Sequence, residues 1–160
     1  MAEILYTDFD HLTEGERNTA NTLRDLPAEW TVICNKVLPR QGKLSREIDF
    51  IVIGENTVLA IDEKSWTGDI QGSDVIWKRA NGDSERSPLN KVDMVAKELA
   101  GYIRRRALRT SGIDREFVYG CVSLTRQNKQ PQIKDPRSPK FVLLYQGLVD
   151  RIRDLDAHLG

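Results

Sequence analysis

Two carboxylates and an ammonium group, those of Asp49, Asp62 and Lys64, lie in two neighbouring segments of the sequence. Both segments are rich in β-branched residues, and a turn-like stretch, residues 54–57, separates them, which predicts a β-hairpin. A two-residue loop at Glu55 and Asn56 would set the register so that Asp49 faces Asp62. Because strand side chains alternate between the two faces, Lys64 would then share a face with both aspartates.

This arrangement predicts a cation between the two aspartates. Directly opposed residues of an antiparallel pair have Cβ atoms about 4.5 to 5.5 Å apart, and like charges at that distance repel. Mg²⁺ suits the position best, because it prefers one or two carboxylates together with waters and substrate phosphates. The alternative comes from the same register, which puts Glu47 opposite Lys64. These two would form an ion pair at the strand end while both aspartates stay solvated.

The first predicted helix offers a third carboxylate, that of Glu16. The segment from Thr13 to Glu16 matches the S/T-x-x-E capping box, so we expect the helix to begin at Thr13. At 100° per residue, Glu16 lies on the apolar stripe with Ala20 and Leu23, whereas Glu14 points away from it. Glu16 either serves only the amide of Thr13 or also faces the acidic side of the hairpin. Glu14 is the control residue for this question.

The remaining elements would surround the hairpin with strands and helices. A strand before the hairpin should lie beside it, a small β-ribbon should follow it, and a strand buried on both faces should come after a long helix. The predicted elements beyond the first helix and the hairpin are, in chain order, a strand over 30–38, a ribbon turning at 80–83, a helix from Leu89 to about Leu108 after the start signal Ser87-Pro88, strands over 117–124 and 140–145, and a helix over 147–159.

Three groups of cations could contact a nucleic-acid backbone. They are Arg40, Lys43 and Arg46 before the hairpin; Arg104, Arg105, Arg106 and Arg109 at the end of the long helix; and the basic segment 126–139, which contains Lys129 and which we expect to be a mobile flap. Each group also has a simpler explanation, because basic loops are solvated and arginines favour the negative end of a helix dipole. Trp66 and Trp77 could stack on unpaired bases, although we expect Trp66 to be structural.

Length and composition predict one domain with a hydrophobic core. The chain has 160 residues, 39% of them hydrophobic, and a formal net charge of zero. No run of about 18 apolar residues predicts a membrane span, and the acidic N-terminus does not resemble a signal peptide. Cys34 and Cys121 lack metal-ligand spacing, so we expect buried reduced thiols in a cytoplasmic protein, without zinc or disulfides. The zero net charge conceals an acidic N-terminus and the basic segment, so a local patch could still bind DNA.

The acid motifs resemble those of a known nuclease family. Asp49 followed by Asp62-Glu63-Lys64 is similar to the core of the PD-(D/E)XK nuclease superfamily. A closer resemblance, to the nuclease-related domain (NERD), covers roughly residues 12 to 125. It rests on four motifs in the right order: Gly15-Glu16, Glu47-Ile48-Asp49, Asp62-x-Lys64-x-Trp66 closing with Gly68, and a helix initiated by Pro88. Where family members often carry glutamine, three residues after this proline, the chain has Lys91, which leaves glutamine-dependent substrate positioning in doubt.

The resemblance implies an α/β fold with a PD-(D/E)XK, restriction-endonuclease-like core, in which helices flank a mixed central sheet. It also implies metal-dependent hydrolysis of DNA phosphodiester bonds, in DNA processing or repair, leaving a 5′-phosphate and a 3′-hydroxyl. Asp49 and Asp62 would hold one or two Mg²⁺ or Mn²⁺ ions, helped by Glu16 and the backbone carbonyl of Glu63. Lys64 would orient the attacking water, and Glu47 would either accept from Lys64 or assist the metal through water.

A second hypothesis is a DNA-binding or adaptor module that keeps the nuclease fold without turnover. Such a module would use the arginine cluster and the basic segment, but the retained Asp49, Asp62 and Lys64 argue against it. We expect residues 1–160 to form a single NERD-like domain, which could also be the N-terminal part of a longer protein, because such domains also occur fused to helicase or kinase regions. DNA is the expected partner, a helicase and a second copy in a homodimer are further hypotheses, and no membrane is expected.

Overall fold

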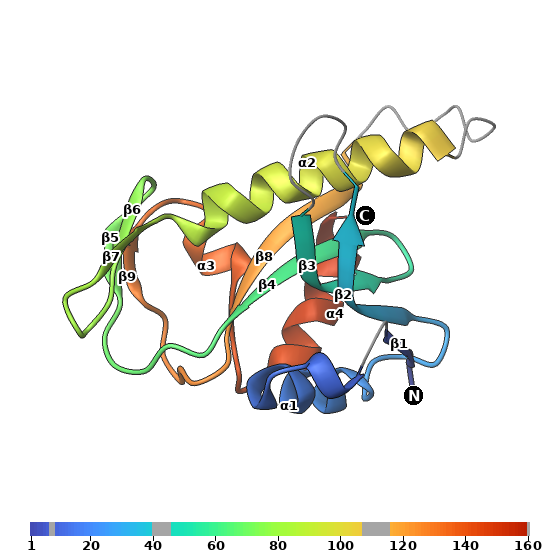
Figure 1. The fold of residues 1–160 in the computed structure, drawn as a ribbon, viewed down its shortest axis with the longest axis horizontal. Helices are drawn as coiled ribbons and strands as arrows, with labels where there is room; N and C mark the ends of the chain where they lie inside the picture. The colour runs from blue at the N-terminus through green and yellow to red at the C-terminus, as the bar shows by residue number, and fades with distance from the viewer. Residues whose placement is uncertain (7–8, 40–45, 107–115, 160) are drawn as a thin grey trace.

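The computed structural model describes residues 1–6, 9–39, 46–106 and 116–159. Its centre is a six-stranded mixed sheet in the order β1-β2-β3-β4-β8-β10 (Figure 1). The antiparallel strands β2, β3 and β4 are flanked by parallel pairings of β1 with β2, β4 with β8, and β8 with β10. The six strands are β1 (Glu3–Tyr6), β2 (Thr31–Leu38), β3 (Arg46–Ile53), β4 (Val58–Lys64), β8 (Val118–Leu124) and β10 (Val142–Leu144).

Helices lie on both sides of this sheet. The long helix α2 runs along one side, and α1 and α4 cover the other (Figure 1). The helices are η1 (Phe9–His11), α1 (Glu14–Leu23), α2 (Pro88–Arg106), α3 (Ser138–Phe141) and α4 (Leu148–Leu159). The predicted fold class, an α/β fold with a mixed central sheet between helices, is therefore confirmed.

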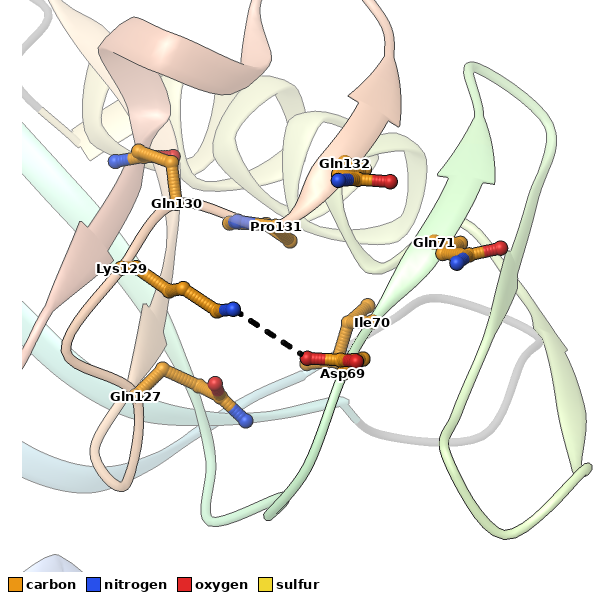
Figure 2. A pocket seen from close by; sticks show the side chains of 8 residues that line it. All are labelled: Asp69, Ile70, Gln71, Gln127, Lys129, Gln130, Pro131 and Gln132. Atoms are coloured by element: carbon orange, nitrogen blue, oxygen red, sulfur yellow. Dashed lines mark ion pairs between the residues drawn. The ribbon is translucent and has the colours of Figure 1, made fainter.

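A second, four-stranded sheet has the order β7-β6-β5-β9 and lies beside the start of α2 (Figure 1). Its strands are β5 (Gln71–Ser73), β6 (Ile76–Lys78), β7 (Ser84–Arg86) and β9 (Gln132–Lys134). The predicted ribbon is the β6-β7 hairpin. Where we expected a mobile flap, the structure has β9 and the start of α3, because β9 pairs with β5 and Arg137 joins Asp135 to Asp93 and Asn90 of α2. The loop before β9 and the start of β5 border a small polar pocket (Figure 2).

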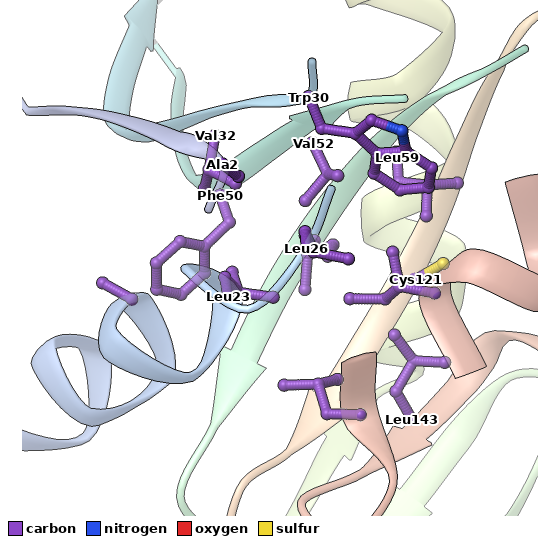
Figure 3. Close-up of a cluster of buried hydrophobic side chains, with 14 of the residues drawn as sticks. Ala2, Leu23, Leu26, Trp30, Val32, Phe50, Val52, Leu59, Cys121 and Leu143 are labelled. Carbon is purple, nitrogen blue, oxygen red and sulfur yellow. The ribbon is translucent and has the colours of Figure 1, made fainter. Parts of the chain in front are cut away.

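Two hydrophobic cores pack against the central sheet, one on each side. The α1-side core (Figure 3) includes Leu23, Val32, Cys34, Phe50, Val52, Leu59, Ile61, Cys121 and Ile152. The α2-side core includes Leu38, Ile48, Ile51, Ala60, Trp66, Trp77, Val92, Ala96 and Val122. Cys34 and Cys121 are buried free thiols, as expected, and burial raises the pKa of each to about 12, so neither is a reactive nucleophile.

The hairpin of β3 and β4 has the predicted register from Ile53–Val58 to Phe50–Ile61, and the ladder ends before Asp49 and Asp62. The backbone nitrogen of Gly54 donates to the carbonyl of Thr57 over 2.9 Å, and Phe50 pairs with Ile61. Helix α4 holds the turn from outside the sheet, because Asp156 accepts hydrogen bonds from the backbone nitrogens of Asn56 (3.0 Å) and Thr57 (2.9 Å). None of the helices in the described residues is long and apolar enough to cross a membrane.

Candidate metal centre and active site

Carboxylates from α1 and β3 meet at one end of the hairpin. One oxygen each from Glu16, Glu47 and Asp49 lies within 4.8 Å of the other two. Glu16 is only 8% exposed, Asp49 is half-buried and Glu47 is exposed. Carboxylate oxygens are the donors that Mg²⁺ and Mn²⁺ prefer, so these three acids fit such an ion, although Asp62, which the sequence predicts as a ligand, is not part of this group of three.

Glu16 combines the two roles that the sequence left as alternatives. Its Oε1 atom accepts from the backbone nitrogen of Thr13 over 3.0 Å, and its own backbone nitrogen donates to Thr13 Oγ1 over 3.1 Å, which completes the capping box. The same carboxylate belongs to the cluster with Glu47 and Asp49. The capping box therefore fixes the start of α1 and also orients a carboxylate toward β3.

Asp49 lies just past the end of the regular β3-β4 ladder. In the described part of the chain, this ladder runs from Ile53–Val58 to Phe50–Ile61. Asp49 Oδ2 instead accepts a hydrogen bond from the backbone nitrogen of Glu63 over 2.9 Å. The pKa of Asp49 is raised to about 8, chiefly by burial and further by Asp62 and Glu16, although the bond from Glu63 opposes the rise. A divalent cation here would favour the ionised form of Asp49.

Lys64 forms an ion pair with Asp62. The alternative interpretation of the sequence had paired it with Glu47. The ammonium nitrogen lies 3.5 Å from Asp62 Oδ2 and 5.6 Å from the centroid of the Trp66 ring. The backbone of Glu47 pairs with Val37 of β2, on the other side of β3. The ion pair therefore holds Lys64 beside the carboxylate that was predicted to bind metal.

A pocket opens between this acidic end of the hairpin and α2. Its walls are Arg46, Glu47, Ile48, Asp49, Ile61, Asp62 and Lys64 from the hairpin and Lys91, Val92 and Val95 from α2. Lys91 occupies the position where the family often has glutamine, so a cation takes the place of an amide on this wall. The pocket thus combines carboxylates with the cations Arg46, Lys64 and Lys91.

The side chain of Glu63 lies on the α1 side of β4. The sequence analysis had assigned a role only to the backbone carbonyl of this residue. Its Oε1 accepts from Thr125 Oγ1 over 2.7 Å. A Cβ atom at Gly15 would lie 2.9 Å from the same oxygen, so the glycine of the Gly15-Glu16 pair makes room for this carboxylate. Burial raises the pKa of Glu63.

Asn35 is a site residue that the sequence analysis missed. With its amide oriented to donate, Nδ2 lies 2.9 Å from Glu16 Oε2 and 3.0 Å from Glu47 Oε1. Its backbone has a φ of 51°, in the left-handed region. A sequence signal existed, because asparagine is unfavourable within strands and is one of the few residues that tolerate this conformation.

The model of one protein family, described as nuclease-related domain, matches residues 12–125. This chain belongs to that family. The match confirms the resemblance seen in the sequence and covers most of the chain. No match was found among curated proteins or among solved structures.

The predicted DNA-contacting cations of this nuclease-related domain do not all lie at the pocket. Arg46 lines it, and its Nε lies 3.1 Å from Glu98 Oε2. Arg104 and Arg105 are exposed near the end of α2, and at 1.5 Å per residue Arg104 is about 20 Å along the helix axis from Lys91. Arg104 also lies over the ring of Phe117, 5.2 Å from its centroid. Arg40, Lys43 and Arg109 lie outside the described residues.

Lys129 belongs to the polar pocket beside the second sheet. Its ammonium lies 3.7 Å from Asp69 Oδ1, and the two side chains are 83% and 77% exposed, so the pair is weak (Figure 2). The other residues that line this pocket are Ile70, Gln71, Gln127, Gln130, Pro131 and Gln132. Gln127 donates to the carbonyl oxygens of Trp66 (2.9 Å) and Gly68 (2.7 Å), which fixes the chain just after Lys64.

Trp66 and Trp77, the two tryptophans considered for base stacking, are core residues. Trp77 is fully buried and Trp66 is 8% exposed, both in the α2-side core. The guanidinium of Arg79 lies 4.7 Å from the ring centroid of Trp66, which covers the indole further. Neither ring offers a free face for base stacking, so the structural interpretation of Trp66 is confirmed and the stacking hypothesis is wrong.

Proposed function

We propose that this nuclease-related domain is a divalent-metal-dependent nuclease that hydrolyses DNA phosphodiester bonds. The observation that carries the proposal is the convergence of Glu16, Glu47 and Asp49, with oxygens within 4.8 Å of one another, at a pocket that Asp62 and Lys64 also line. Burial, with smaller contributions from Asp62 and Glu16, raises the pKa of Asp49 to about 8, and a bound cation would offset this cost of ionisation. Acid clusters of this kind, with a lysine beside them, suit phosphoryl chemistry.

The metal would be Mg²⁺ or Mn²⁺, held by Glu16, Glu47, Asp49 and Asp62, with the backbone carbonyl of Glu63 as a further ligand. When bound, such an ion acts as a Lewis acid on the phosphate and lowers the pKa of a bound water. The carboxylates would determine where the metal ion binds. The hydrogen bond from Thr125 Oγ1 to Glu63 Oε1 links β4 to the residue that follows β8.

The remaining residues of the pocket would act on the substrate. Lys64, held 3.5 Å from Asp62, would orient the attacking water and stabilise negative charge on the phosphate. Arg46 and Lys91, on opposite walls, would bind phosphates of the DNA strand and place the scissile bond over the acids. Arg104, Arg105 and Lys129 lie farther out and would contact the DNA backbone beyond the pocket.

The proposal extends to the cellular role. A nuclease of this kind would act in DNA processing or repair in the cytoplasm, with DNA as its partner. Both hydrophobic cores pack against the same central sheet, which supports the proposal that residues 1–160 form one domain.

Cleavage of supercoiled plasmid and of single-stranded circles tests the proposal. We expect wild type to nick or linearise DNA with Mg²⁺ or Mn²⁺ but not with EDTA, Asp62→Ala to lose cleavage while it still binds DNA, and Glu14→Ala, changed at an exposed acid of α1, to match wild type. Absence of cleavage in every metal, together with salt-sensitive binding in a gel shift, would overturn the enzyme and favour a DNA-binding module.

A further inference from the structure

In β2 and β3, the regular alternation of side chains between the two faces of the central sheet is interrupted at one position, beyond which the faces are exchanged. In β2, Ile33 packs against the α2-side core and so does Leu38, although regular alternation would put them on opposite faces. In β3, Ile48 and Ile51 both belong to the α2-side core, with the same contradiction. The inversion therefore lies between the pairs Cys34–Phe50 and Lys36–Ile48, and the residues between these pairs are Asn35 in β2 and Asp49 in β3.

Asn35 supplies the backbone conformation that goes with this inversion. In the described residues, it is the one residue other than glycine with positive φ, at 51°. Asparagine enters the left-handed region several-fold more readily than most residues, whereas a β-branched residue there is strained. Because Ile48 turns toward α2, its neighbour Glu47 can turn toward Glu16 on α1. A regular strand would direct Glu47 to the same face as Ile51, away from α1.

The side chain of Asn35 then bridges the two carboxylates that the inversion brings together. Its amide nitrogen lies 2.9 Å from Glu16 Oε2 and 3.0 Å from Glu47 Oε1. Hydrogen bonds from a neutral amide to ionised oxygens are strong and add no charge. They orient Glu16 and Glu47 while leaving the second oxygen of Glu47 available, and Glu16 Oε1 remains with the capping box.

We propose that Asn35 is the positioning residue of the metal centre, because its left-handed backbone brings Glu47 to Glu16 and its amide holds both carboxylates in place. This inference rests on the proposed function, since it concerns the same cluster of acids. Asn35 would act through the two carboxylates that its amide contacts. Removing a residue that orients metal ligands typically lowers metal affinity 10- to 100-fold.

Two substitutions distinguish the contribution of the Asn35 backbone conformation from that of its side-chain amide. Asn35→Gly keeps access to positive φ but removes the donor, whereas Asn35→Val removes the donor and also disfavours positive φ. Asn81→Gly, in the exposed turn of the β6-β7 hairpin, is the matched control. Each variant of the full chain is titrated with Mn²⁺ by calorimetry, and its thermal unfolding in EDTA is recorded alongside.

We expect Asn35→Gly to bind Mn²⁺ about tenfold or more weakly than wild type. Asn35→Val should bind more weakly still, and Asn81→Gly should match wild type. Asn35→Gly with wild-type affinity would overturn the role of the amide, and a folded Asn35→Val with the affinity of Asn35→Gly would overturn the role of the backbone. If Asn35→Val does not fold, Asn35→Gly still decides the role of the amide. Wild type that binds no Mn²⁺ would instead refute the metal centre itself, so the two failures are distinguishable.

Discussion

The carboxylate of Asp49 on β3 accepts a hydrogen bond from the backbone nitrogen of Glu63 on β4, over 2.9 Å. This bond continues the contact between the two strands past the end of their ladder and holds Asp49 against the other acids. It does not offset burial and the charges of Asp62 and Glu16, which together raise the pKa of Asp49 to about 8. Without metal, ionisation of Asp49 therefore lowers the stability of the folded state.

This pKa predicts how the stability of the metal-free protein depends on pH. An unfolded aspartate has a pKa of about 3.9, so between that pH and about 8 the folded state binds more protons than the unfolded state. The contribution of Asp49 to stability is thus greatest at low pH and declines as pH rises through this range. In EDTA, we expect thermal unfolding scans of wild type to show this decline between pH 5 and 8. Asp49→Asn should flatten it, and Glu14→Gln should retain it. Equal slopes for wild type and Asp49→Asn would contradict the prediction.

Asp156 of α4 should be a major determinant of hairpin stability. It is 3% exposed and accepts from the backbone nitrogen of Thr57 (2.9 Å) and from Thr57 Oγ1 (2.8 Å). Asp156→Ala would leave both donors of the buried Thr57 without this acceptor, at about 1–3 kcal/mol for each unsatisfied group. We expect a loss of about 3 kcal/mol in the free energy of unfolding, measured in urea. Asp154→Ala, at an exposed position of the same helix, should change it little; an equal loss there would count against the prediction.

Lys91 should contribute one phosphate contact to DNA binding. It lines the pocket beside Asp49 and Asp62, whereas Lys97 is exposed on the same helix outside the pocket. Each phosphate contact on duplex DNA adds about 0.9 to the slope of log affinity against log salt concentration. In an Asp62→Ala background, we expect Lys91→Ala to reduce this slope by roughly one. Lys97→Ala should leave it unchanged, and a similar reduction in both variants would show that Lys91 acts only through overall charge.

Local sequence rules predicted the parts of the site that depend on local geometry. The two-residue turn gave the register of the hairpin, and helical periodicity placed Glu16 on the inward side of α1. The predicted opposition of Glu47 and Lys64 lies beyond the regular β3-β4 ladder, which ends at Phe50–Ile61, and Lys64 forms its ion pair with Asp62. The inversion at Asn35 belongs to two strands at once, so the pattern of either strand alone does not reveal it.

Other elements escaped prediction because their pairings are short or distant. The strand β1 has only four residues and gains its hydrogen bonds from β2, which follows it by more than twenty residues. The strand β9 has three residues and pairs with β5, sixty residues earlier in the chain. Its surroundings are polar, and a half-buried network of polar contacts centred on Arg137, rather than an apolar pattern, attaches this segment to α2. Such pairings are tertiary interactions, which residue propensities do not encode.

Anomalous scattering from crystals grown with Mn²⁺ tests the metal centre most directly. We predict an anomalous peak within bonding distance of carboxylate oxygens of Glu16, Glu47 and Asp49, and its loss in crystals of Asp49→Asn grown under the same conditions. No peak at this cluster, or a peak elsewhere that persists in Asp49→Asn, would contradict the assignment of these acids as the metal site.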